Sequence, residues 1–397
     1  MSDTGGGHRA AAEAIRDALV IRHGDEVQVE LVDVFRHYSP FPFKYMPEFY
    51  PWWVNHSKSS WAMGYKLSNT KARARMVARS LYLSIEKGLK QMFREHPADV
   101  VVCVHSLFSQ TAIRALNRTF DERPPFMIVV TDLVSTHMFW YDKHADRCLV
   151  PTKPALERGL EAGLRRDQMR LTGLPVNPGF TESLPTKAAA RAELGWDPDL
   201  PAVLLVSGGE GMGPLYETAR AINNMNLPCQ IAVVAGRNRQ LKADLEASTW
   251  HHPAHIYPFI NFMPTLMAAA DILVTKAGPA TITEACIAGL PLILSDAIPG
   301  QETGNVEFIM KNKAGVYAPS PDAVAAAVKS FLSDGPAGLA KRSERVKKLA
   351  LPNAVWDIAD EVWEQAQRKR IPTQRRTLKD RFNDVTRGLS ELTISGP

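Results

Sequence analysis

Two glycine-rich segments carry residue types that could bind phosphate groups and move a proton. In the first, TGGGH at residues 4–8, Gly5, Gly6 and Gly7 leave the backbone open to a ligand, and His8 follows directly. A histidine there could act as a general base, because the unperturbed pKa of imidazole lies near neutral pH. The second segment, residues 207–214, holds four glycines in six residues and ends in a proline that suits the first turn of a helix. The backbone N–H groups of such a loop can bind a diphosphate.

A third stretch, residues 271–305, combines a clear element pattern with acidic and amide side chains. It reads as a strand, a tight turn, a helix that begins at Pro279, a second strand and a polar loop. Glu284, near the start of the helix, could accept hydrogen bonds from two vicinal hydroxyls, such as a ribose diol. Gln301 and Glu302 in the polar loop could bind the hydroxyls of a hexose. The helix N-terminus could hold a phosphate.

Alternating strands and helices must position these segments. Short apolar runs followed by helical patterns predict the α/β class, with parallel sheets whose carboxyl-edge loops bind ligands. The 397 residues suit two domains of this kind. We predict domains at residues 1–178 and 187–350, joined by a linker rich in proline and glycine. Residues 351–397 are predicted to form a helix that returns to the first domain, followed by a basic tail.

The first domain begins without the strand that should precede its glycine loop. A doubly wound domain places such a loop after its first strand, yet TGGGH starts at Thr4. The segment Val27–Val34 is predicted as the next strand. The first sheet is therefore expected to have an unfilled position, which a start codon assigned too late would explain.

An aromatic segment, residues 38–67, lies outside this alternating pattern. It interleaves Trp, Tyr and Phe with proline and lysine, shows no clean period, and precedes a basic helix predicted over Ser68–His96. One interpretation is a packed irregular insertion. The other is an interfacial surface for an anionic membrane or an entrance for the lipid acceptor. Trp and Tyr favour the headgroup level of a membrane, and lysine and arginine are attracted to anionic lipids.

Bulk properties exclude several classes of protein. The net charge of +5 comes with no nucleic-acid motif, and no apolar run is long enough to span a bilayer. The four cysteines are far apart, which predicts buried free thiols. No DxD or His/Asp cluster in the second domain implies a metal, and Lys276 could supply part of the positive charge that Mg²⁺ provides elsewhere.

The segments together resemble the family of monogalactosyldiacylglycerol synthases and processive diacylglycerol glucosyltransferases, which are relatives of the N-acetylglucosaminyltransferase that makes lipid II. The resemblance covers most of the chain up to about Ala318. It rests on five motifs in order: SDTGGGHRA at residues 2–10, VVTDLVSTHMFW at 129–140, VSGGEGMGP at 206–214, TKAGPATITEA at 275–285 and IPGQETGN at 298–305.

The resemblance implies a fold, a reaction and a place of action. The fold is GT-B, two Rossmann-like domains that face each other across a cleft, with the acceptor in the first domain and the donor in the second. The reaction is inverting transfer of a hexose, with galactose favoured and glucose possible, from a UDP-sugar to 1,2-diacylglycerol. The product is a β-linked glycolipid. The protein would act as a peripheral protein at the cytoplasmic face of a membrane.

The residues themselves suggest a mechanism that is consistent with this reaction. His8 is the expected base, with rate loss on acidification at a pKa of roughly 6–7, and Asp132 and His137 are expected to orient the base or the acceptor. Gly5, Gly6 and Gly7 form a phosphate or acceptor loop. The predicted donor-binding residues are Gly208, Gly209, Glu210, Gly211, Gly213, Arg237, Phe259, Lys276, Gly278, Pro279, Thr281, Glu284, Gln301, Glu302 and Asn305.

Other interpretations stay open at this point. A glycosyltransferase that acts on a polyprenyl-linked acceptor would keep the second domain and alter the acceptor side. A non-hydrolysing sugar-nucleotide epimerase shares the fold but needs acid–base pairs around the sugar. A pure binding module would have little use for a histidine in the cleft. For His8 itself, the alternative to a base is a residue that caps its helix and contacts a phosphate.

Overall fold

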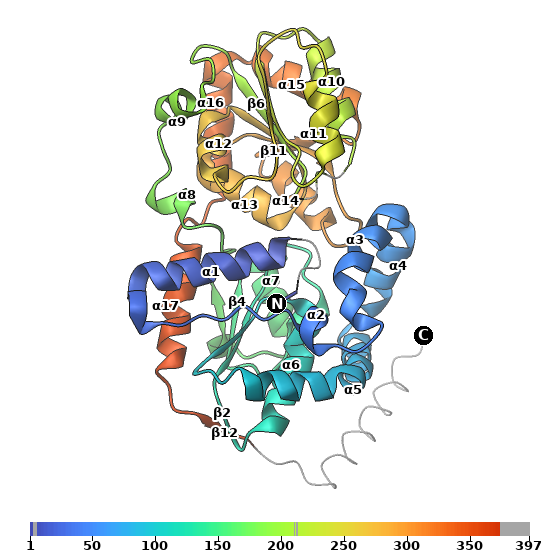
Figure 1. Ribbon diagram of the computed structural model, residues 1–397, viewed down its shortest axis with the longest axis vertical. Coiled ribbons are helices and arrows are strands. Elements are labelled where there is room, and N and C mark those ends of the chain that lie inside the picture. The colour runs from blue at the N-terminus through green and yellow to red at the C-terminus, as the bar shows by residue number, and fades with distance from the viewer. Residues whose placement is uncertain (3–5, 210, 212, 374–397) are drawn as a thin grey trace. The chain divides into compact units, whose positions relative to one another are not determined.

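A computed structural model describes residues 1–2, 6–209, 211 and 213–373 of the chain (Figure 1). The chain divides into two compact units. Unit 1 comprises Met1–Gly173 together with the chain from Val355 onward, and unit 2 comprises Leu174–Ala354. Each unit contains one parallel sheet with helices on its faces, which confirms the predicted α/β class.

The sheet of unit 1 has the strand order β1-β3-β4-β5, and every neighbouring pair is parallel. Residues alternate between its two faces, as the period of a strand requires. Met127 and Val129 pack under α1 and α17, whereas Phe126 and Ile128 pack under α5 and α6. The elements are β1 (Val101–Cys103), β3 (Phe126–Val129), β4 (Arg147–Val150), β5 (Met169–Leu171), α1 (Gly7–His23), α5 (Lys71–Glu95), α6 (Ser106–Thr119), α7 (Lys153–Ala162) and α17 (Ala354–Ala366).

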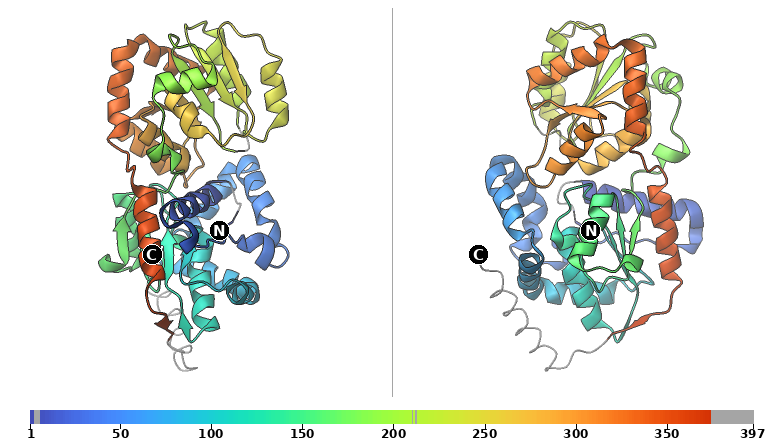
Figure 2. Two further views of the ribbon diagram at one scale, coloured as in Figure 1. Left: turned by 60° about the vertical axis from the view of Figure 1, so that its left-hand side comes forward. Right: turned by 180° about the vertical axis from the view of Figure 1, so that it is seen from behind.

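Helices α1 and α17 lie side by side on one face of this sheet, although they come from opposite ends of the described chain (Figures 1 and 2). The ring of His23 stacks on Trp363 at 3.8 Å between centroids. The Arg22 guanidinium pairs with Asp360 and also lies over the ring of Trp356. Helix α17 therefore contributes to the core of unit 1 and secures the first helix, which carries His8.

The strand predicted over Val27–Val34 is wrong. Residues 27–33 are assigned to no strand, and Val34 begins the short helix α2 (Val34–Tyr38). The segment makes two backbone hydrogen bonds to Met1: the Met1 ammonium donates to the Val32 carbonyl at 2.9 Å, and the Val34 N–H donates to the Met1 carbonyl. A strand requires a ladder partner, and the two contacts to one residue do not make a ladder.

The aromatic segment is helical rather than irregular. It forms a short 3-10 turn, η2 (Phe43–Tyr45), followed by the helices α3 (Met46–His56) and α4 (Lys58–Ser68). The two helices form a hairpin in which the rings of Trp53 and Trp61 meet edge to face at 5.3 Å, and the Trp53 Nε1–H donates to Ser60 Oγ. The aromatic side chains of one helix pack against those of the other. The sequence therefore shows no regularly spaced apolar stripe of the kind that predicts a helix.

The sheet of unit 2 has the order β11-β10-β9-β6-β7-β8 and is entirely parallel. Successive strands run outward in both directions from the β6/β9 pair, which makes that pair the topological switch point where such sheets bind ligands. The strands are β6 (Ala202–Val206), β7 (Gln230–Val234), β8 (Ala254–Tyr257), β9 (Ile272–Lys276), β10 (Leu292–Asp296) and β11 (Gly315–Tyr317).

Helices connect the strands of unit 2, and α10 and α13 follow the two strands of the switch point. These helices are α9 (Lys187–Leu194), α10 (Leu215–Asn224), α11 (Arg239–Glu246), α12 (Met263–Ala269), α13 (Pro279–Ala288), α14 (Thr303–Lys311), α15 (Pro321–Ser333) and α16 (Gly335–Lys347). A four-residue helix, α8 (Gly179–Glu182), precedes them.

Three further features complete the fold. All four cysteines are free and buried, as predicted. No helix within the described residues is long and apolar enough to cross a membrane. A two-stranded ladder joins β12 (Ile371–Pro372) to β2 (Glu122–Arg123), and the predicted basic tail beyond residue 373 lies outside the described residues.

Candidate active site

At the carboxyl edge of the unit 1 sheet, His8 lies against residues that follow two neighbouring strands. His8 is in the first turn of α1, and its Nδ1 lies 2.8 Å from the Oγ1 of Thr131, just beyond β3. The ring of His105, just beyond β1, is 4.5 Å from the His8 ring between centroids, and the ring of Trp140 is 6.0 Å away. Strands β1 and β3 are neighbours, so their loops converge on the same histidine.

Burial of the His8 ring lowers its pKa to about 4. The positive charge of the chain's amino terminus lowers this pKa further, and a hydrogen bond to the Val104 backbone opposes the shift. The expectation of a pKa near 6–7 is therefore wrong for this structure, because the charged imidazolium is poorly solvated among the surrounding rings. At neutral pH the ring is uncharged, which is the form that can accept a proton.

The two residues predicted to orient the base have other partners. Asp132 is buried, and its Oδ2 accepts a hydrogen bond from the Trp140 Nε1–H at 2.7 Å. The preceding residue, Thr131, places its Oγ1 in contact with the His8 ring. Asp132 therefore fixes Trp140, whose ring forms part of the wall beside His8.

His137 connects the aromatic hairpin to the loop after β3. Its Nδ1 accepts from the Phe139 N–H at 3.1 Å, so the ring proton is on Nε2. Nε2 lies 3.1 Å from Ser68 Oγ, at the end of α4. Burial also lowers the pKa of His137 to about 4. With both ring nitrogens bonded, His137 serves as an anchor between α4 and η3 (Met138–Trp140) in this structure.

In unit 2, the loops after β6, β9 and β10 meet around Lys276, the last residue of β9. Its ammonium lies 2.7 Å from Glu302 Oε1, in the loop after β10. A Cβ atom built on Gly278 would lie 3.3 Å from the same ammonium, and one on Gly208 would lie 3.8 Å from Lys276 Cε. Asn305, on α14, stabilises the turn between β9 and α13, because its Nδ2 donates to the Ala277 carbonyl at 2.9 Å.

Glu302 is buried, and each carboxylate oxygen has a partner. Oε1 pairs with Lys276, and Oε2 accepts from the Ile298 N–H at 2.9 Å. The side chain is only 3% exposed. The prediction that Glu302 binds hexose hydroxyls stays a prediction, and in this structure the carboxylate is fully used within the protein. Its neighbour Gln301 is half-buried in the same loop.

The glycine loop after β6 packs against the loop after β7. The Arg237 N–H donates to the Gly209 carbonyl at 2.9 Å, and the Arg237 guanidinium lies over the ring of Phe259, 4.3 Å from its centroid. Gly211 has a φ of +59°, and a Cβ there would lie 2.1 Å from the Ala235 carbonyl oxygen, so only glycine fits. Phe259 is 52% exposed, which leaves a ring face at the edge of the loop.

The remaining donor residues lie around the start of α13 or in the glycine loop. Gly278 is the N-cap of α13, Pro279 is its first residue and Thr281 lies in its first turn. Burial raises the pKa of Glu284, one turn further along, to about 7. Gly213, with a φ of +80°, ends the glycine loop. Glu210 and Gly5 fall outside the described residues, and Gly6 and Gly7 are exposed at the start of α1.

Sequence reasoning did not assign roles to Thr131, His105 or Trp140, which surround His8. The sequence could have indicated Thr131 and His105, because each follows a predicted strand, and ligands bind at that edge of a parallel sheet. Within the described residues, no group of three His, Cys, Asp or Glu side chains could hold a metal ion.

Comparison with known proteins identifies the family of this chain. Residues 8–176 match the family described as monogalactosyldiacylglycerol (MGDG) synthase, and residues 203–351 match the glycosyltransferase family 28 C-terminal domain. Monogalactosyldiacylglycerol synthase 3, chloroplastic, of Arabidopsis thaliana is 38% identical over 381 residues, which are 94% of this chain and 82% of that protein. The corresponding chloroplastic synthase of Spinacia oleracea is 38% identical over 379 residues, 93% of this chain and 72% of that protein. The chain belongs to the MGDG synthase family.

Solved structures confirm the GT-B type of fold for this family member. MurG of Acinetobacter baumannii superposes with a TM-score of 0.52 at 16% identity, covering 72% of this chain and 79% of MurG. A protein of Listeria monocytogenes described as a UDP-N-acetylglucosamine 2-epimerase superposes with a TM-score of 0.51 at 15% identity, covering 72% and 77%. These similarities show the fold alone, so the sequence family distinguishes this chain from the epimerases.

Proposed function

We propose that this MGDG synthase family member transfers galactose from UDP-galactose to the free hydroxyl of 1,2-diacylglycerol. The observation that carries the proposal is the 38% identity to named monogalactosyldiacylglycerol synthases along 94% of the chain. The predicted alternative sugar, glucose, is not favoured by these relatives, which are named for galactosyl transfer. The alternative of a polyprenyl-linked acceptor is supported only by the similarity of this chain's fold to those of other glycosyltransferases, which does not establish a substrate.

The acceptor side of the reaction is assigned to unit 1. The hydroxyl oxygen of diacylglycerol attacks C1 of galactose on the face opposite UDP, and the C1–O bond to UDP breaks as the new bond forms. The neutral ring of His8 accepts the hydroxyl proton. Thr131 and His105 orient the ring, which supports this role. Attack on the opposite face converts the α-linkage of the donor into a β-linked product.

The donor side is assigned to unit 2. The leaving UDP carries the electron pair of the broken bond, so its diphosphate needs positive potential. Lys276, the N-terminus of α13 and the N–H groups of the glycine loop are the proposed sources. Glu284 is proposed to hold the ribose diol and Gln301 to hold the sugar. The stacked Arg237 and Phe259 are proposed to border the base.

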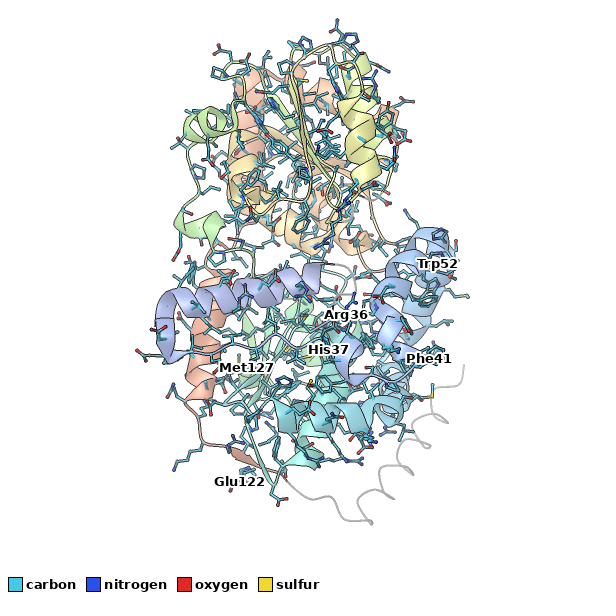
Figure 3. All side chains as sticks on the ribbon, in the orientation of Figure 1. Arg36, His37, Phe41, Trp52, Glu122 and Met127 are labelled. Atoms are coloured by element: carbon cyan, nitrogen blue, oxygen red, sulfur yellow. The ribbon has the colours of Figure 1, made fainter. Side chains whose placement is uncertain are left out.

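We further propose that the aromatic hairpin, α3 and α4, and the start of α5 dock on an anionic membrane surface. Trp52 on α3 is 55% exposed, and Phe41, which precedes η2 and α3, is 77% exposed (Figure 3). Exposed lysines and arginines accompany them, including Lys44, Lys66 and Arg73. Apolar rings combined with basic side chains suit a peripheral protein at a charged interface. The cytoplasmic face stays a prediction.

The proposal is tested by the choice of substrate. The purified protein is incubated with vesicles that contain diacylglycerol and with radiolabelled UDP-galactose or UDP-glucose, and the lipids are separated. We expect one galactosyl lipid, formed only with diacylglycerol present. Preferential transfer of glucose, or transfer to a polyprenyl-linked acceptor and not to diacylglycerol, would contradict the proposal.

A further inference from the structure

Lys276 occupies an electrostatically unfavourable position. Its ammonium lies beside Gly278, the N-cap of the ten-residue helix α13. The N-terminus of a helix carries partial positive charge, so a cation there is repelled and an anion is attracted. A lysine held at this point adds its charge to that of the helix and concentrates positive potential at one end of β9.

Glu302 keeps the lysine in that position. Its Oε1 binds the ammonium at 2.7 Å, and its Oε2 is fixed by the Ile298 N–H. The Glu302 backbone N–H also donates to the Ile298 carbonyl at 2.8 Å, so the residue is held by backbone and side chain together. A buried carboxylate with both oxygens engaged is a rigid anchor, because any other rotamer would leave buried polar atoms unpaired.

The anchor aims the ammonium at the glycine loop after β6. Lys276 Cε lies 3.8 Å from where a Cβ on Gly208 would be, so the lysine stem passes beside the first glycine of that loop. Strands β6 and β9 are neighbours at the switch point of the sheet. The ammonium, the start of α13 and the glycine loop therefore surround one place at which an anion would be stabilised.

We propose that Glu302 is a positioning residue that acts through Lys276 and holds the ammonium ready for the diphosphate of the donor. This inference rests on the proposed function, because it takes the diphosphate of a UDP-sugar as the anion. A lysine–glutamate ion pair positions the phosphate-binding lysine of protein kinases in the same chemical sense, on an unrelated fold. Glu302 thereby affects phosphate binding without touching the nucleotide.

The isosteric variant Glu302→Gln gives a test in which two effects change UDP affinity in opposite directions: the loss of the Glu302 charge and the loss of the fixed position of the Lys276 ammonium. Removal of a carboxylate close to a diphosphate should, by charge alone, tighten UDP binding. Loss of the anchor should weaken it, because the ammonium is then free to leave the helix N-terminus. We expect calorimetry to show UDP affinity lowered about tenfold or more, the range for a hydrogen bond to a charged group, with uridine affinity unchanged.

A double-mutant cycle with Lys276→Met identifies the route of the effect. In the Lys276→Met background, Glu302→Gln should cause little further loss of UDP affinity. Glu307→Gln and Lys311→Met, exposed positions of α14, are the matched controls and should bind UDP normally. Melting temperatures of all variants show whether the fold survives, and Glu302→Asp provides a second variant that retains the carboxylate.

Two results would overturn the inference. UDP affinity that is unchanged or tighter in Glu302→Gln would show that Glu302 does not position Lys276 for phosphate. A loss confined to UDP-galactose, with UDP binding intact, would assign Glu302 to the sugar instead. Failure of the proposed function is distinguishable, because wild-type protein would then bind no UDP or make no galactosyl lipid.

Discussion

The two units place different chemistry at the same edge of the same kind of sheet. In unit 1 the edge carries aromatic rings and the buried carboxyl group of Asp132, and His8 and His105 both have pKa values lowered by burial. In unit 2 the edge carries the Lys276–Glu302 ion pair and the start of a helix. An uncharged lipid hydroxyl needs a neutral base in apolar surroundings, whereas a nucleotide diphosphate needs fixed positive charge. Under the proposed function, one sheet architecture would serve a lipid acceptor in unit 1 and an anionic donor in unit 2 through different loops.

The largest effect should come from the unit 1 edge. We expect His8→Ala to reduce turnover by roughly 10²–10⁴-fold, the contribution of a general base, with UDP affinity nearly unchanged because the proposed donor residues all belong to unit 2. Steady-state kinetics and calorimetry measure the two quantities separately. A variant that keeps wild-type turnover at saturating substrate, or that mainly raises the Michaelis constant, would move the base elsewhere and leave His8 a phosphate contact.

The pH profile of turnover gives a second measure of the same residue. Because the pKa of His8 is lowered to about 4, the ring is already neutral at pH 6. Turnover through this base should therefore stay level on acidification through the ordinary histidine range and fall only as the pH approaches about 4. A steep loss centred near the ordinary histidine pKa would show that the working base is solvated normally.

The next effect concerns the unit 2 edge alone. Glu284→Ala should weaken UDP binding by about 1–3 kcal/mol, the loss expected for charge-assisted hydrogen bonds to the ribose. Glu217→Ala, an acidic residue in the first turn of α10, is a suitable control. Equal affinities for Glu284→Ala and wild type by calorimetry would remove Glu284 from the donor site.

Acid should weaken donor binding through Glu284. Burial raises the pKa of this carboxyl to about 7, so below that pH the free protein holds the protonated acid. The ribose hydroxyls donate to the ionised carboxylate, so binding must release a proton, and affinity for UDP-galactose should fall by up to about tenfold per pH unit below pH 7. Above pH 7 it should be level. An identical slope in Glu284→Gln would assign the pH dependence to another group.

The sequence predicts the sheets better than the segments around them. Runs such as Ala202–Val206 are buried on both faces and therefore read as strands without reference to their partners. Residues 27–34 read VQVELVDV, which also suits a strand, but a ladder needs a neighbouring strand that the described chain does not provide. The aromatic hairpin has no helical stripe, because its rings pair across two helices.

The same distinction applies to the site. Motif order and strand ends predict which residues reach each carboxyl edge, including His8 and Lys276. Sequence does not show the direction of a long side chain. The pairing of Lys276 with Glu302 depends on the fold of two separate loops, and the contact of His8 with Thr131 depends on how the loop after β3 folds.

A smaller effect is expected for membrane binding. The proposed membrane-docking surface belongs to unit 1, and we expect no such surface on unit 2. Trp52→Ser should reduce co-sedimentation with anionic vesicles about three- to tenfold, since part of a large apolar side chain no longer enters the interface. Met225→Ser, an exposed apolar position of unit 2, is the control. Binding should also fall as salt rises, because exposed charges are screened over about 8 Å at physiological ionic strength. Binding insensitive to both Trp52 and salt would reject this surface.

The smallest expected effect is that of chelation. Lys276 and the start of α13 supply positive charge at the proposed diphosphate position, so EDTA should leave most of the activity intact. Activity is measured with and without the chelator, and then after addition of Mg²⁺ or Mn²⁺. Complete loss that either ion restores would mean that the charge of unit 2 is insufficient.

The configuration of the product tests the central claim most directly. If a neutral base in unit 1 delivers the lipid hydroxyl to the face opposite the UDP held by unit 2, the α-linked donor must give a β-linked product. UDP-galactose and diacylglycerol are converted by the wild-type protein, and proton NMR of the purified glycolipid reports the anomeric coupling. We predict β-galactosyl diacylglycerol as the single product. An α-linked product would contradict direct displacement by the lipid hydroxyl and with it the division of labour between the two units.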